Sequence, residues 1–210
     1  MLTRIIGDVH GLWNDYQTVI ADCDRSIQLG DFGVGMGQGD YWHDRVNDTI
    51  GGTGHRFIRG NHDNPNQCPK MLSWIADGTV ENDVMFVGGA WSIDADYRTP
   101  GYDWWQTEQL SSSEFERVLD TYLTVRPRVM ITHDCPTLTA YRMFIRTGKR
   151  VWGGQPKLYL TRTGEMLQYM FEQHQPEQWY FGHWHYTSRE KIEGTVFQCL
   201  AELDYIDVEI

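Results

Sequence analysis

Side chains that commonly bind metal ions recur at the ends of apolar runs in this chain. Five such runs end in metal-competent groups, namely Asp8 and His10, Asp31, Asn61 with His62, His133, and finally His183 with His185. Five of the eight histidines therefore fall at these ends, whereas His43, His55 and His174 do not. Imidazole nitrogens and carboxylate or amide oxygens are ligands of divalent metal ions. The pattern predicts one metal site assembled from residues far apart in the sequence.

The two histidines of "GHWH" pose a geometric question because they are one residue apart. On a regular strand His183 and His185 point to opposite faces, so they reach one centre only if the chain turns just after the strand. The other interpretation of this fragment is one core histidine and one histidine in a solvated loop. The remaining runs favour a shared site, because the carboxyl ends of strands in an α/β sheet lie along one edge, where ligands bind.

Short apolar runs that alternate with amphipathic segments predict an α/β core. We expect strands within residues 2–6, 26–31, 55–63, 83–91, 127–134 and 178–185. Helices are expected just after the first strand, at 111–123 and around 166–171. The second of these helices begins with Ser111 and Glu114 at capping-box spacing. Two closing strands, within 194–200 and 205–210, suggest a second sheet packed on the first. No repeat or linker divides the chain, so we expect one domain over residues 1–210.

The charge balance limits the classes of partner. With 18 basic and 29 acidic residues the formal net charge is −11, so the field of the molecule repels polyanions and disfavours non-specific nucleic-acid binding. A phosphate site must then supply its own positive charge, most economically as bound metal ions. The cysteines form no CxxC pair, no apolar stretch reaches the length of a membrane span, and the first Gly-Asp comes too early for a signal peptide. We therefore expect a cytoplasmic protein with no membrane partner.

Five short blocks give the chain a resemblance to a known family. They are "GDVHG" at 7–11, "GD" at 30–31, "GNHD" at 60–63, "THD" at 132–134 and "GHWH" at 182–185. In this order, each after an apolar run, they resemble the blocks of calcineurin-like metallophosphoesterases. The resemblance implies a small single-domain member in which two facing mixed β-sheets are flanked by helices.

The resemblance also implies a ligand set for two divalent metal ions. Asp8, His10 and His185 would hold one ion, Asn61, His133 and His183 would hold the other, and Asp31 would bridge the two. Such a mixture of nitrogen and oxygen ligands suits manganese, iron or zinc. A water between the two ions is expected to lose a proton and to supply a hydroxide nucleophile for attack at phosphorus.

The third block suggests how the leaving group is protonated. The resemblance assigns the proton-donor role to His62, and the adjacent Asp63 is expected to orient the His62 ring and keep it protonated. Protein phosphatases of this superfamily continue the second block as GDxxDRG, whereas Asp31 here leads into "FGVGMG". Because that arginine is absent, Arg98 and Arg59 are the candidates for binding the substrate phosphate.

The sequence leaves three functions open. The first is metal-dependent hydrolysis of phosphate mono- or diesters, with a small phosphorylated substrate that includes nucleotides. The second is a catalytically silent binding module of the same fold. The third is a DNA nuclease, which the negative charge and the lack of a basic stripe disfavour. The aromatic segment 91–105 either packs in the core or stacks on a nucleobase or phenyl ester. The oligomeric state is open.

Overall fold

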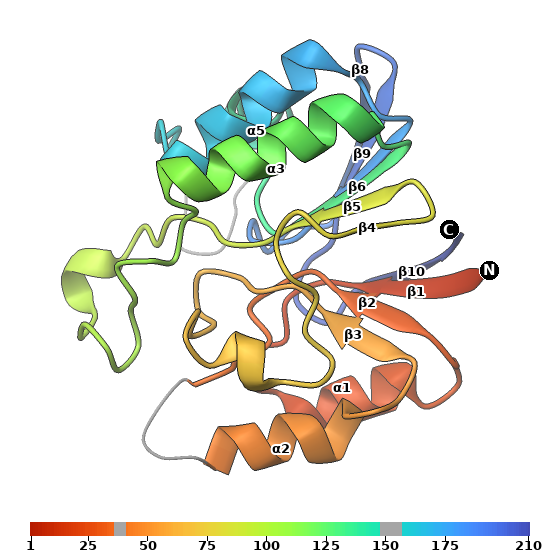
Figure 1. The fold of residues 1–210 in the computed structure, drawn as a ribbon, viewed down its shortest axis with the longest axis vertical. Coiled ribbons are helices and arrows are strands. Elements are labelled where there is room, and N and C mark those ends of the chain that lie inside the picture. Colours follow the sequence, from red (N-terminus) through yellow and green to blue (C-terminus); the bar gives the residue numbers. More distant parts are fainter. Residues whose placement is uncertain (36–40, 148–156) are drawn as a thin grey trace.

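Two mixed β-sheets face each other in the computed structural model, which describes residues 1–35, 41–147 and 157–210 (Figure 1). The four-stranded sheet has the order β10 (Tyr205–Glu209), β1 (Leu2–Ile6), β2 (Ser26–Gln28) and β3 (His55–Phe57). The six-stranded sheet has the order β4 (Val80–Glu81), β5 (Val84–Val87), β6 (Val129–Thr132), β7 (Gln178–Phe181), β9 (Thr195–Cys199) and β8 (Ser188–Ile192). Strands β1 to β3 are parallel, as are β5, β6, β7 and β9, while β10, β4 and β8 are antiparallel to their neighbours. The predicted fold class is confirmed.

Helices cover the outer face of each sheet (Figure 1). The four-stranded sheet carries α1 (Trp13–Ile20) and α2 (Tyr41–Ile50), and the six-stranded sheet carries α3 (Ser112–Val125) and α5 (Arg162–Gln173). Shorter helical turns are η1 (Cys68–Lys70), η2 (Ala95–Tyr97), α4 (Thr137–Ala140) and the π-helix η3 (Tyr141–Ile145). Among the described residues, no helix has both the length and the apolar character needed to cross a lipid bilayer.

Alternation along the strands separates the apolar cores. In β1, Ile5 belongs to a buried cluster that contains residues of both sheets, whereas Ile6 packs with α1 residues such as Tyr16. In β5, Phe86 faces the core between the sheets, and Met85 packs with residues of α3 and α5. Each sheet is therefore buried on both faces, which leaves the carboxyl ends of its parallel strands as the place for polar side chains.

The predicted helices are confirmed, and each predicted strand range contains a strand. Helix α3 begins at the predicted capping box, in which the Glu114 N–H donates to the Ser111 hydroxyl and the Ser111 N–H donates to the Glu114 carboxylate. The two closing strands were expected to form the second sheet, and this was wrong. Strand β9 pairs with β7 in one sheet, whereas β10 pairs with β1 in the other. The second sheet is centred on β5, β6 and β7 instead. Strand β8, "SREKI", was not expected, since an edge strand with one exposed face needs little apolar sequence.

Candidate metal centre

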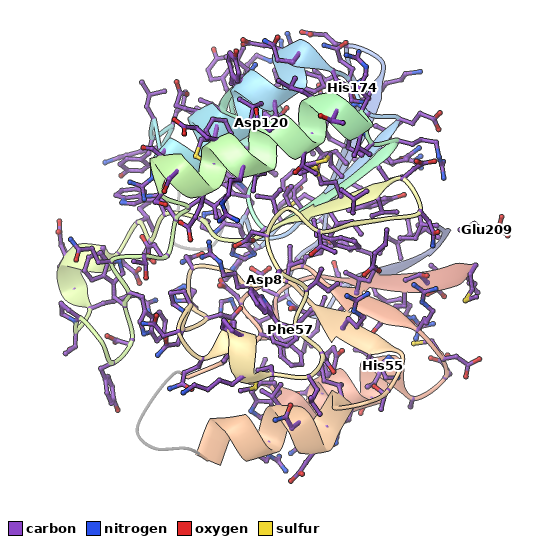
Figure 2. All side chains as sticks on the ribbon, in the orientation of Figure 1. Asp8, His55, Phe57, Asp120, His174 and Glu209 are labelled. Carbon is purple, nitrogen blue, oxygen red and sulfur yellow. The ribbon has the colours of Figure 1, made fainter. Side chains whose placement is uncertain are left out.

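The carboxyl ends of strands from both sheets meet at one place. Asp8 and His10 follow β1, Asp31 follows β2, Asn61 and His62 follow β3, His133 follows β6, and His183 with His185 follow β7. Figure 2 shows Asp8 in the gap between the two sheets, whereas His55 and His174 lie toward the periphery. The structure thus brings together the residues that the sequence selected, although they come from two sheets and not from the edge of one.

A first group of candidate ligands surrounds the end of β1. The ligating atoms of Asp8, His10, Asp31 and His185 all lie within 4.8 Å of one another. The two imidazole Nε2 atoms of His10 and His185 are 3.1 Å apart, and His185 Nε2 is 3.0 Å from Asp8 Oδ2. Two nitrogens and two carboxylates at this spacing can surround a single cation.

A second group lies beside the first and shares Asp31 with it. It contains Asp31, His133 and His183, and Asn61 Oδ1 lies 3.0 Å from His133 Nε2. Asp31 Oδ1 is 3.4 Å from His133 Nε2, while Asp31 Oδ2 is 3.9 Å from His10 Nε2. Asp31 therefore presents one oxygen to each group, which is an arrangement in which a carboxylate can bridge two cations.

A hydrogen bond on the side of the ring away from the site fixes the orientation of His133. Its Nδ1 lies 2.7 Å from the backbone carbonyl of Leu29, and because a carbonyl only accepts, Nδ1 donates there. Nε2 is then the atom that faces Asp31 and Asn61. A histidine whose second nitrogen donates to a carbonyl is the usual arrangement for a metal ligand.

The backbone at these positions adopts conformations that side chains normally avoid. His10, Asp31, His183 and His185 have φ angles of 48°, 56°, 64° and 48°, in the left-handed region where non-glycine residues are uncommon. The left-handed turns after β7 explain how the side chains of two histidines one residue apart reach adjacent groups of candidate ligands. Strain of this kind is concentrated at functional sites.

Two motif glycines allow the close approach of the carboxylates. A Cβ atom at Gly60 would lie 2.0 Å from Asp31 Oδ1, and a Cβ atom at Gly182 would lie 2.2 Å from Asp8 Oδ1. Both distances are far below a van der Waals contact, so any larger residue would displace a candidate ligand. This close approach gives the glycines of "GNHD" and "GHWH" a steric role at the site.

Opposite charges hold Asp8, Asp31 and His133 in their ionised forms. Burial alone would raise the pKa of Asp8, but the hydrogen bond with His185 and the charge of His133 lower it below its usual value. Burial is likewise overcome at Asp31, where the charges of His133 and His62 hold the pKa well below its usual range. Burial opposes protonation of His133, yet the carboxylates of Asp31 and Asp8 raise its pKa to about 10. The negative charges of Asp8 and Asp31 are therefore stabilised by nearby positive charge, which bound divalent cations would supply in place of protons.

Asp63 does not have the predicted role. Its carboxylate accepts four backbone hydrogen bonds of 2.7 to 3.0 Å, from the N–H groups of Phe32, Gly33, Val34 and Gly60. His62 Nδ1 is buried without a hydrogen-bond partner, so the expectation that Asp63 orients the His62 ring was wrong. Asp63 instead ties the loop after β2 to the loop after β3, and these loops carry Asp31 and Asn61.

The two candidate arginines differ in their surroundings. Arg59 is 4% exposed, its Nε donates to Asp77 at 2.8 Å and its Nη1 donates to the backbone carbonyl of Glu108. The expectation that Arg59 binds substrate was therefore wrong, because its guanidinium is buried and paired. Arg98 lines the cleft beside the site, where its Nη2 lies 3.4 Å from His62 Nε2 and its Nε donates to Asp94.

The cleft next to the candidate ligands has an aromatic wall. Trp91, Ile93 and Tyr159 line the cleft together with Arg98. The rings of Trp91 and Tyr159 are 5.0 Å apart, whereas Trp105 is only 5% exposed. Trp105 therefore packs in the core, as one of the two predicted roles requires, while Trp91 lines the cleft and its stacking on a substrate stays a prediction. Tyr159 was not singled out from the sequence, because no motif marks it.

Comparison with the profiles of known families defines the class of protein. The profile of the calcineurin-like phosphoesterase family matches residues 1–187, so this chain belongs to that family. No curated protein matches the chain.

Solved structures of low sequence identity share the fold. TT1561 of Thermus thermophilus is 9% identical with a TM-score of 0.56, and the match covers 96% of this chain and 90% of that one. A putative 5'-nucleotidase from Staphylococcus aureus is 16% identical with a TM-score of 0.54. The match covers 96% of this chain and 48% of that one. GAP50, the anchor in the inner membrane complex of Plasmodium, is 8% identical with a TM-score of 0.53, over 95% of this chain and 71% of that one. At these identities the similarity concerns the fold alone.

Proposed function

We propose that this protein hydrolyses small phosphate mono- or diesters with the help of two divalent cations. The observation that carries the proposal is the pair of adjacent ligand groups that share Asp31. Asp8, His10 and His185 would hold one cation, Asn61, His133 and His183 would hold the other, and Asp31 would be shared between them. When bound, such cations lower the pKa of a water molecule and offset the charge that develops on a phosphoryl group.

Two residues at the edge of the site, His62 and Arg98, have separate roles in the proposed reaction. His62 donates a proton to the leaving oxygen, because its Nε2 faces the cleft between Asp31, at 3.9 Å, and Arg98. Burial lowers the pKa of His62, and Arg98 adds to this effect. The negative charge of a bound phosphate ester would raise that pKa again and so protonate the donor when substrate is present. Arg98 contacts the phosphate from the same side of the cleft.

The aromatic wall favours a substrate with a planar leaving group. Ile93 and Tyr159 are 64% and 39% exposed, and they lie with Trp91 beside the candidate ligands. Exposed apolar side chains in a cleft gain by contact with an apolar part of a ligand. A nucleotide fits this requirement, since its base can stack on the wall while its phosphate reaches the cations.

The first experiment measures turnover of p-nitrophenyl phosphate and bis-p-nitrophenyl phosphate by metal-stripped protein. Manganese, zinc or magnesium is added back, and Asp31→Asn is the control. Turnover that depends on the metal and is lost in Asp31→Asn supports the enzyme. Metal binding without turnover of either ester contradicts a general phosphoesterase and favours a binding module.

A matched pair of substrates tests the substrate class. Adenosine 5'-monophosphate and ribose 5-phosphate share a primary alkoxide leaving group and differ in the base. Stacking of a base on an aromatic side chain contributes about 1–3 kcal/mol, so we expect kcat/KM to favour the nucleotide by about 5- to 150-fold. Trp91→Ala should reduce this ratio. Equal kcat/KM values for the two substrates in the wild-type protein would refute the stacking proposal.

A further inference from the structure

The side-chain amide of Asn61 must present the correct end to the site. Its Oδ1 faces His133 Nε2 at 3.0 Å, and its Nδ2 donates to the hydroxyl of Ser92 at 3.0 Å. Rotation of the amide by half a turn would exchange oxygen and nitrogen with little change in shape. Only the oxygen can ligate a cation, since the NH₂ group would point its hydrogens at the positive charge. A device that selects one orientation is therefore needed.

Ser92 and Glu108 provide the chemistry for that selection. The Ser92 hydroxyl donates to Glu108 Oε2 at 2.6 Å, and the Ser92 N–H donates to Glu108 Oε1 at 2.9 Å. Each of the three side chains, including Asn61, is 2% exposed, so water does not offer alternative partners. Because a carboxylate only accepts, the single hydroxyl proton of Ser92 points to Glu108. The Ser92 oxygen can then only accept from Asn61, which turns the NH₂ group away from the site.

Arg59 holds the backbone of Glu108 in place. The guanidinium donates to the Glu108 carbonyl and forms an ion pair with Asp77 at 2.8 Å. Gly89, which follows β5, donates its N–H to the Arg59 carbonyl at 2.8 Å. The buried arginine thus links the segment that carries Ser92 and Glu108 to the strand end that carries Asn61.

We propose that Ser92 and Glu108 are positioning residues that set the direction of the hydrogen bonds to Asn61, so that its oxygen faces the second cation. This inference rests on the proposed function, in which Asn61 is a ligand. Neither residue belongs to a sequence block of the family resemblance, and neither touches the reacting atoms. They act through the orientation of Asn61.

Glu108→Gln is the sharpest test because it keeps the shape of the side chain and replaces one acceptor oxygen by an NH₂ donor. With its oxygen on the Ser92 N–H, the glutamine would donate to the Ser92 hydroxyl, which frees the hydroxyl proton to point to Asn61 and so favours the orientation with the NH₂ group toward the cation. Isothermal titration with Mn²⁺ of metal-stripped protein, with the metal content of the loaded protein as a second readout, reports both sites. We expect the second ion to bind about 10- to 100-fold more weakly, as for other residues that support metal ligands.

The chain offers a matched control in a second serine–glutamate pair. At the start of α3 the Ser111 hydroxyl donates to Glu114 Oε2 at 2.6 Å, and the Ser111 N–H donates to the same oxygen at 2.8 Å. Glu114→Gln makes the same chemical change away from the candidate ligands and should leave the affinity for both ions unchanged. Ser92→Ala, which deletes one hydroxyl, carries the test if Glu108→Gln does not fold.

The outcomes separate this inference from the proposed function. A wild-type protein that binds no Mn²⁺ contradicts the proposed function itself. A wild-type protein that binds two ions, with Glu108→Gln and Ser92→Ala equally tight, overturns the positioning role alone. In an Asn61→Ala background Glu108→Gln should cause no further loss of affinity, because the residue acts through Asn61. If Glu108→Gln lowered the Mn²⁺ affinity as much in that background as in the wild-type protein, the inference would also be overturned.

Discussion

Replacement of Asp63 by asparagine should destabilise the protein strongly. Asp63 Oδ1 accepts from Gly33 and Val34, and Oδ2 accepts from Phe32 and Gly60. In Asp63→Asn one of these oxygens becomes an NH₂ group that faces two N–H donors, so two hydrogen bonds are lost in either orientation. Hydrogen bonds to a charged group contribute about 1.5–3 kcal/mol each, which gives about 3–6 kcal/mol in total.

The lower end of that range is the better expectation. Burial and the charge of Asp31 raise the pKa of Asp63, while the backbone donors oppose that rise. Part of the hydrogen-bond energy thus only offsets the cost of keeping the buried carboxylate charged. A loss of about 3 kcal/mol is still a large share of the roughly 5–15 kcal/mol that stabilise a typical domain. The two loops that Asp63 connects also carry candidate ligands, so metal affinity should fall with stability.

Urea unfolding of the metal-free protein measures this effect. With an m value of about 2 kcal/mol/M, a loss of about 3 kcal/mol lowers the midpoint by about 1.5 M. Asp24→Asn is the control, because Asp24 is exposed and the same substitution there should shift the midpoint by much less. A destabilisation of Asp63→Asn no greater than that of Asp24→Asn would refute the assignment of Asp63 as the tie between the loops.

Three further predictions concern the site. His62→Gln should lower kcat about 10²- to 10³-fold for an alkyl phosphate but much less for p-nitrophenyl phosphate, whose leaving group needs no proton; equal losses would argue against the proton-donor role. Since a donor must be protonated, wild-type kcat for the alkyl ester should fall as pH rises through the pKa of His62 in the substrate complex, and the variant should lack this limb. Gly182→Ala places a Cβ 2.2 Å from Asp8 Oδ1 and should weaken metal binding, whereas Gly52→Ala meets no atom within 4 Å and should not; equal effects would contradict the steric argument. Because the pKa of His133 is raised to about 10, metal loading at neutral pH should release a proton, visible in calorimetry as a dependence on buffer ionisation enthalpy; a binding enthalpy that does not depend on the buffer would contradict this expectation.

The central residues of the site could be predicted because their signal is local. A polar group directly after an apolar run marks a strand end, and His133 and His183 both follow this rule. The capping box of α3 is local in the same sense, since its donor and acceptor are three residues apart. The convergence of the strand ends then follows from the general geometry of α/β proteins.

The roles of Asp63 and Arg59 could not be predicted because they depend on partners distant in the chain. Asp63 is adjacent to His62 in sequence, yet its acceptors face N–H groups about thirty residues earlier. Arg59 lies beside the third block, but its side chain points to Asp77 and to the carbonyl of Glu108. Adjacency in sequence indicates position, whereas side-chain direction is set by packing. Ser92 and Glu108 carry no local signal for the same reason.

Anomalous diffraction from crystals of the manganese-loaded protein tests the central claim most directly. The account predicts two anomalous peaks about 3.5–4 Å apart, with one oxygen of Asp31 directed to each peak. Asp8, His10 and His185 should surround one peak, and Asn61, His133 and His183 the other. A single peak, or peaks that lie away from Asp31, would contradict the proposed two-cation site.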